Sequence, residues 1–179
     1  MSEKLDQRVK RLGDRLIELA RTSDTRSESR AALAELRQAF HNPLRAAKHV
    51  VPCFGNEDRD DEHWFYLIAS LFALQRNHTA GVSLGSAFRQ IKDDSGSIEG
   101  RFVALLSAPA DQLPERLRSA VTLLESRKVG LDWYRLLSDV LGWEWEGKPK
   151  QRALARDFYR VNREDNSDAT PSVSATGEE

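Results

Sequence analysis

Arginine side chains recur near the end of the chain at intervals of 4, 4 and 3 residues, at Arg152, Arg156, Arg160 and Arg163. An α-helix turns by about 100° per residue, so this spacing places the four guanidinium groups on one face, and residues four apart rise by about 6 Å. Guanidinium groups suit phosphate oxygens, and a row of them at this rise can reach successive phosphates. The pattern therefore predicts a face that contacts the backbone of a nucleic acid.

The opposite face of the same predicted helix is apolar. Leu154, Phe158 and Val161 form a stripe that is expected to pack against the rest of the chain, and Asp157 is the only acidic residue between positions 148 and 163. Tyr159 flanks the arginines, where its ring could stack on a base. The alternative interpretation is an ordinary solvated surface, although surface helices usually mix charges of both signs.

Two other predicted helices carry smaller sets of arginines. Arg116 and Arg127 share one flank of the helix that follows Pro114, whereas Arg118 points elsewhere. A third set lies on the first predicted helix and consists of Arg8, Arg11 and Arg15. The acidic residues Asp14 and Glu18 lie nearby and dilute the charge of that third set.

No arrangement of residues typical of a catalytic or metal site occurs in the sequence. The four histidines lack the spacing of a zinc site, and residues 81–85 lack the features of a phosphate-binding loop. The acidic residues 57–62 lack the pattern of a calcium-binding EF-hand, and Cys53 is predicted to be a small buried side chain. We therefore predict that the chain is not an enzyme and has neither a metal nor a cofactor.

The composition is that of one soluble domain or two small lobes. The 179 residues include 27 Lys and Arg against 28 Asp and Glu, so the net charge of −1 gives no whole-molecule signal for nucleic-acid binding. A single cysteine cannot form an internal disulfide, and the first residues do not resemble a signal peptide. The longest apolar run, residues 64–74, is shorter than the roughly 20 residues of a membrane span. A cytoplasmic location is therefore expected.

Apolar residues recur at helical spacing along nearly the whole chain, without the alternation of a half-buried strand. The sequence therefore predicts an all-α fold of about eight helices. Ser83 and Ser97 are expected as N-caps and Pro114 at a first helical position. Asp60, Asp61 and Glu62 are expected in the first turn of the helix that contains residues 64–74. The other predicted helices span 4–21, 27–40, 83–92, 97–106, 114–128, 131–143 and 150–163.

The predicted helices suggest two small packed lobes, residues 1–80 and 81–163, hinged near residues 77–83. Residues 164–179 are acidic and polar, with Val173 as their only sizeable apolar side chain. Such a segment cannot bury enough apolar surface to offset its ordering entropy. We therefore predict that this C-terminal tail is disordered.

Five sequence phrases between residues 62 and 159 are informative when they are taken together. In order, they are EHWFYLIASLFAL, GVSLGSAFRQI, SIEGRFVALLSA, LPERLRSAVTLLESRKVGLDWYRLLSDVLGW and QRALARDFY. Their order and spacing resemble the CasB family, the small subunit of the type I-E CRISPR surveillance complex called Cascade, over residues 31–159.

This resemblance implies an all-α, non-enzymatic subunit of an antiviral ribonucleoprotein. It implies contacts with the other Cascade subunits, including the backbone and large subunits, with a second copy of the chain, with the crRNA, and with the target DNA and its displaced strand. The expected function is to bind the nucleic-acid backbone and to stabilise the R-loop. The alternative is a helical protein–protein adaptor with no direct nucleic-acid role.

The resemblance also carries basic positions onto this sequence as candidate nucleic-acid-binding residues. They are Arg89, Arg101, Arg116, Arg118, Arg127, Lys128, Arg152 and Arg156, to which the helical spacing adds Arg160. Ser86, Gly100 and Leu154 depart from the family pattern. The departures at Ser86 and Gly100 weaken the expected contact with the DNA strand at these two positions. The departure at Leu154 changes the packing of the helix and not its charge.

Overall fold

The computed structural model describes residues 2–54 and 60–160, and these ranges confirm the predicted all-α class. The helices of these ranges are α1 (Ser2–Thr22), α2 (Ser27–Gln38), α3 (Ala47–Val50), α4 (Glu62–Leu74), α5 (Leu84–Gln90), α6 (Ser97–Leu106), α7 (Leu113–Ser126), α8 (Trp133–Leu141) and α9 (Pro149–Tyr159). Two short 3-10 turns, Pro43–Ala46 and Val51–Cys53, flank α3. None of the predicted helices covers α3, since a helix of 4 residues leaves no periodic pattern in the sequence. The predicted disordered tail, residues 164–179, lies outside the described residues.

Helix α4 lies at the centre of the core. Nearly all of its side chains from Trp64 to Ala73 are buried, which is typical of a helix that is apolar on every side. Phe72 of α4 meets Trp133 of α8 edge to face, with ring centroids 5.3 Å apart. Glu62 lies in the first turn of α4 as expected, but Asp60 and Asp61 precede the helix. The carboxylate of Asp61 instead pairs with Arg8 of α1.

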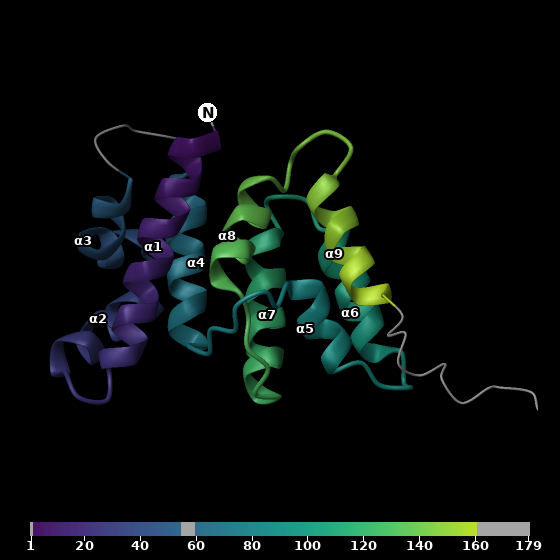
Figure 1. The fold of residues 1–179 in the computed structure, drawn as a ribbon, viewed down its shortest axis with the longest axis horizontal. Coiled ribbons are helices and arrows are strands. Elements are labelled where there is room, and N and C mark those ends of the chain that lie inside the picture. The colour runs from purple at the N-terminus through teal and green to yellow at the C-terminus, as the bar shows by residue number, and fades with distance from the viewer. Residues whose placement is uncertain (1, 55–59, 161–179) are drawn as a thin grey trace, which may run out of the picture.

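Helix α8 lies between α1 and α4 on one side and α9 on the other, and it contacts all three (Figure 1). The segments next to α8 add further contacts with the end of α4 and the residues after it. The side-chain amide of Gln75 donates to the carbonyl of Val129 at 2.5 Å, and the amide of Thr79 donates to the carbonyl of Leu131 at 3.0 Å. On α8 itself, the hydroxyl of Tyr134 donates to Asp14 of α1 at 2.7 Å. The division into lobes at residues 80 and 81 stays a prediction.

The helix starts agree with the sequence in two of three predicted places. The Ser83 side chain accepts a hydrogen bond from the Ser86 amide at 3.1 Å, so it caps α5 as expected. Pro114 occupies the first turn of α7. The expectation for Ser97 was wrong, because Gly96 is the N-cap of α6 and has φ of 70°. Glycine reaches this left-handed conformation without a steric cost.

Helix α9 packs closely against α5. A Cβ at Gly85 of α5 would collide with the carbonyl oxygen of Leu154, so only glycine permits this approach. Leu154 and Phe158 are 0% and 1% exposed, and the Phe158 ring stacks on Phe102 of α6 with centroids 4.5 Å apart. The predicted apolar face of the last helix is therefore confirmed at these two positions, whereas Val161 lies outside the described residues.

Candidate nucleic-acid interface

The outward face of α9 carries Arg152 and Arg156, whose side chains are both exposed. Neither forms an ion pair with a described residue. They are one helical turn apart, as the spacing predicts. The predicted helix was too long, however, because α9 ends at Tyr159 and Arg160 has an extended backbone with ψ of 120°. Arg160 therefore does not continue the helical row, and Arg163 lies outside the described residues.

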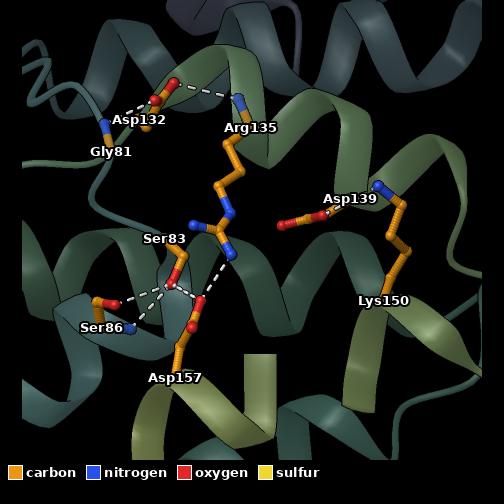
Figure 2. Close-up of polar contacts among 8 residues, drawn as sticks. All are labelled: Gly81, Ser83, Ser86, Asp132, Arg135, Asp139, Lys150 and Asp157. Atoms are coloured by element: carbon orange, nitrogen blue, oxygen red, sulfur yellow. Dashed lines mark hydrogen bonds and ion pairs between the residues drawn. The ribbon is translucent and has the colours of Figure 1, made fainter. Parts of the chain in front are cut away.

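Asp157, the one acidic residue of α9, is directed into the molecule rather than towards the arginine face (Figure 2). Its Oδ2 accepts hydrogen bonds from Ser83 Oγ and from Arg135 Nη2, both at 2.6 Å. Its negative charge is therefore matched by Arg135 of α8. Asp157, the only acidic residue of α9, therefore does not compensate the positive charges of the arginines on the outward face of this helix.

The first turn of α9 is held by a second ion pair (Figure 2). Lys150 Nζ lies 3.2 Å from Asp139 Oδ1 on α8 and the same distance from the Ser138 hydroxyl. Burial raises the pKa of Asp139, and the charge of Lys150 opposes that effect in part. Together, the contacts of Lys150 and Asp157 fix the rotation of α9 on α8.

Arg89 and Arg160 come together at the C-terminal end of α9. The guanidinium of Arg89 donates to the backbone carbonyl of Arg160 at 3.3 Å. Cations at a helix C-terminus interact favourably with the helix dipole. The structure thus brings together two predicted site residues that are 71 positions apart in the sequence.

Tyr159 is half exposed beside this end of the helix. Its hydroxyl donates to Glu99 at 2.7 Å, and Lys92 lies 3.2 Å from the same carboxylate. These hydrogen bonds from Tyr159 and Lys92 lower the pKa of Glu99. The ring that was expected to stack on a base is therefore anchored by its hydroxyl. Lys92 was missed by sequence reasoning, because the acidic residues that follow it mask its charge.

Arg101 of α6 and Arg116 of α7 line one cavity of about 230 Å³. Both side chains are exposed, and neither is paired with a described acidic residue. The sequence placed these two residues on different helices with no relation between them. Their convergence results from the packing of α6 against α7.

The remaining candidates lie on other parts of α7 and on the turn after it. The Arg118 guanidinium lies over the Phe40 ring, 4.4 Å from its centroid, away from Arg116 as predicted. The predicted helix 114–128 ends earlier, at Ser126. Arg127 is exposed at the C-cap, and Lys128 pairs with Glu125 at 2.9 Å.

The three-arginine set predicted on the first helix is not a surface set. Arg8 is 4% exposed, and its guanidinium donates two hydrogen bonds to Asp61, at 2.8 and 3.0 Å. It also lies over the Phe65 ring. Arg8 therefore helps to hold α1 against the start of α4, and only Arg11 and Arg15 of this set are exposed.

Comparison with known proteins decides the family of the chain. Residues 32–159 match the family model described as CRISPR-associated protein Cse2. The chain belongs to the Cse2 family. A curated Cse2 protein from Thermus thermophilus is 34% identical over 154 residues, which cover 82% of this chain and 89% of that protein. The resemblance to CasB is thereby confirmed.

Solved structures share the fold of this Cse2-family chain. The crystal structure of CasB from Thermus thermophilus superposes with a TM-score of 0.71 at 33% identity, covering 83% of this chain and 98% of that one. A chain of a CRISPR RNA-guided surveillance complex has the same fold, with a TM-score of 0.69 and 24% identity over 87% of this chain and 93% of that one.

The described part of this Cse2-family chain contains no cluster of His, Cys, Asp and Glu suited to a metal ion. His49 instead pairs with Glu35 at 2.6 Å. Cys53 is buried, as predicted, and burial raises the pKa of its thiol. None of the helices in the described ranges has the length and apolar character to cross a membrane.

Proposed function

We propose that this Cse2-family chain is the non-catalytic small subunit of Cascade, and that it binds nucleic-acid backbone to stabilise the R-loop. Its family membership and the shared fold of a chain in an RNA-guided surveillance complex support this role. In RNA-guided recognition, base pairing reads the sequence. A protein subunit of such a complex needs only to hold the backbones of the guide, the target and the displaced strand.

The observation that carries the proposal is the uncompensated charge of Arg152 and Arg156. Both are exposed on a rigidly docked helix, while Asp157 of the same helix is bound to Arg135 and Ser83. Because the helix is already docked, binding of phosphates orders only the two arginine side chains and not the backbone that carries them. Two contacts alone give weak binding, but anchoring within a larger assembly supplies a high local concentration of the strand.

The proposed partners are the backbone and large subunits, a second copy of the chain, the crRNA, the target DNA and the displaced strand. Arg152→Glu/Arg156→Glu in the assembled complex tests the nucleic-acid part. We expect weaker binding of target DNA across a salt titration and unchanged thermal stability, because both side chains face away from the core. Arg30→Glu, an exposed arginine on α2, is the matched control. Equal affinity of the wild type and the double variant would overturn the role of this face.

A second candidate is a helical protein–protein adaptor with no nucleic-acid contact. It is favoured by Leu44 and Val51, apolar residues that are 82% and 46% exposed in the turns that flank α3. The adaptor would co-purify with partner subunits, and its own interface with the complex would not depend on RNA. Retention of crRNA and DNA by the complex at rising salt, with and without this subunit, distinguishes the two functions.

A further inference from the structure

The arginine face of α9, formed by Arg152 and Arg156, is exposed and forms no ion pair with a described residue. A third cation lies at the C-terminal end of the same helix, where Arg89 donates to the backbone carbonyl of Arg160 at 3.3 Å. The Arg89 charge offsets the negative end of the helix dipole at this point. An acidic segment of chain that follows Arg160 is therefore attracted to this side of α9 and not repelled by its end.

The sequence that follows α9 has the charge that the arginine face lacks. Residues 164–179 contain five acidic residues and neither lysine nor arginine. Three of the acidic residues lie within residues 164–168, the acidic segment, at Glu164, Asp165 and Asp168. This segment lies beyond residues 32–159, so the match to the family model assigns no role to it.

The length of chain between α9 and the acidic segment permits a return to the arginine face. Glu164 lies 4 residues beyond Arg160, and 4 extended residues span at most about 13–14 Å. Arg156 lies 4 residues before Arg160, which in a helix corresponds to a rise of only about 6 Å. Because Arg160 already has an extended backbone, the chain does not have to continue along the axis of α9.

Tethering favours this return over binding of a free anion. A group joined to its site through a short linker has an effective concentration in the millimolar range. One exposed pair of a carboxylate and a guanidinium contributes little, but three carboxylates beside two arginines offer several such pairs. The other carboxylate on α9 does not compete for this face, because Asp157 is bound to Arg135 and Ser83.

We propose that the acidic segment docks on Arg152 and Arg156 and competes there with the phosphates of a nucleic acid. The docked carboxylates occupy the positions that phosphate oxygens would take. A strand that meets the free chain must displace them, whereas a strand held beside α9 by a larger assembly does so more readily. The docking does not depend on a nucleic-acid role, and only the competition rests on the proposed function.

Amide NMR spectra of the full-length chain without nucleic acid test the docking. At low salt, we expect the resonances of residues 164–168 to differ between the wild type and Arg152→Gln/Arg156→Gln. The difference is expected to disappear near about 0.5 M salt, because salt screens exposed ion pairs. Arg30→Gln, on the exposed side of α2, is the control and should leave these resonances unchanged. Identical resonances in the wild type and the double variant at low salt overturn the inference.

Fluorescence anisotropy with a labelled oligothymidylate at low salt tests the competition. Glu164→Gln/Asp165→Asn is expected to bind about threefold more tightly than the wild type, as for a face that is free about one third of the time. Asp24→Asn/Asp111→Asn removes the same charge from exposed positions outside α9 and is expected to bind as the wild type does. Equal affinity of the wild type and Glu164→Gln/Asp165→Asn contradicts the competition.

The same two substitutions in the Arg152→Gln/Arg156→Gln background separate docking from general repulsion. The gain in affinity is expected to vanish there, because the acidic segment no longer has a face to cover. A gain that persists overturns the inference, since the segment then repels nucleic acid without docking. Resonances of residues 164–168 that change only on assembly with partner subunits also overturn it, because the segment then binds a partner.

Failure of this inference is distinct from failure of the proposed function. If the NMR resonances do not respond to Arg152→Gln/Arg156→Gln but target-DNA binding by the assembled complex is weakened, the inference is wrong and the role of the arginine face stands. If the resonances respond but target-DNA binding is unchanged, the docking is confirmed and the proposed role of this face is wrong.

Discussion

Arg135 Nη2 and Asp157 Oδ2 lie 2.6 Å apart and connect α8 to α9. The carboxylate also accepts a hydrogen bond from Ser83 at the start of α5, so one side chain connects three helices (Figure 2). The rotation of α9, and with it the direction in which Arg152 and Arg156 point, depends on this connection.

Asp157→Asn is expected to destabilise the chain by about 1 kcal/mol, because it removes the charge that pairs with Arg135. A hydrogen bond to a charged group contributes roughly 1.5–3 kcal/mol, and partial exposure of this pair reduces that value. Urea denaturation gives the measurement. Asp24→Asn, at an exposed position in the turn after α1, is the control. Equal midpoints for Asp157→Asn and the wild type would contradict the structural role.

Gly85→Ala is expected to destabilise the chain by about 1–3 kcal/mol, because the new methyl group must push the backbone of α9 away from α5. Gly100→Ala on α6 is the matched control, since a Cβ there meets no atom within 4 Å. Alanine is the better helix former, so this control is expected to be more stable by about 0.5–1 kcal/mol. Denaturant unfolding measures the free energy of unfolding of both variants, which is expected to decrease for Gly85→Ala and to increase for Gly100→Ala. A neutral Gly85→Ala would show that α5 and α9 are not in close contact.

Phe158→Ala is expected to lower the free energy of unfolding by about 3–5 kcal/mol, as is usual for a buried phenylalanine. The side chain is 1% exposed and stacks on Phe102, so its removal leaves a cavity between α6 and α9. Calorimetry provides the thermal midpoint. An unchanged midpoint would mean that α9 is not docked on this core.

The pH dependence of stability contains a contribution from Asp139. Burial raises the pKa of this carboxyl above its ordinary value of 3.8, so the folded chain holds the proton more tightly than the unfolded chain does. The stabilisation that this proton provides is present at low pH and is lost as the pH rises through the raised pKa. The asparagine of Asp139→Asn does not titrate, so the variant lacks this pH-dependent loss. The free energy of unfolding of the wild type minus that of the variant is therefore expected to fall as the pH rises above 3.8. Unfolding measured at a series of pH values checks this trend. A constant difference between the two proteins would contradict it.

Arg152→Ala/Arg156→Ala is expected to reduce the salt dependence of target-DNA binding by the assembled complex. Each phosphate contact contributes about 0.7–0.9 to the slope of log affinity against log salt concentration, so the slope is expected to become shallower by about 1.4–1.8. Binding isotherms at several salt concentrations give this slope. Arg30→Ala is expected to leave it unchanged, and the same slope for all three proteins would show that the α9 arginines contact no phosphate.

The features that the sequence predicted best are those that depend on the periodicity within one helix. The apolar run of α4 and the buried positions Leu154 and Phe158 of α9 follow from helical spacing alone, because each residue's face is set by its own helix. The end of α9 at Tyr159 was not predicted, since basic residues continue the pattern beyond it.

The parts of the candidate site that the sequence did not predict depend on how helices pack. Arg8 looked like a member of a surface row, but the aromatic rings and Asp61 beside it come from elsewhere in the chain. Arg101 and Arg116 share a cavity only because α6 and α7 lie side by side. Periodicity within one helix carries no information about such encounters.

Two successive residues of α8 reach in opposite directions. Tyr134 donates to Asp14 of α1, and Arg135 donates to Asp157 of α9. Both belong to the first turn of one short helix, so α9 cannot shift relative to α1 unless a contact breaks or α8 moves with it. The first turn of α8 is therefore one path by which a force on the arginine face reaches the N-terminal helix.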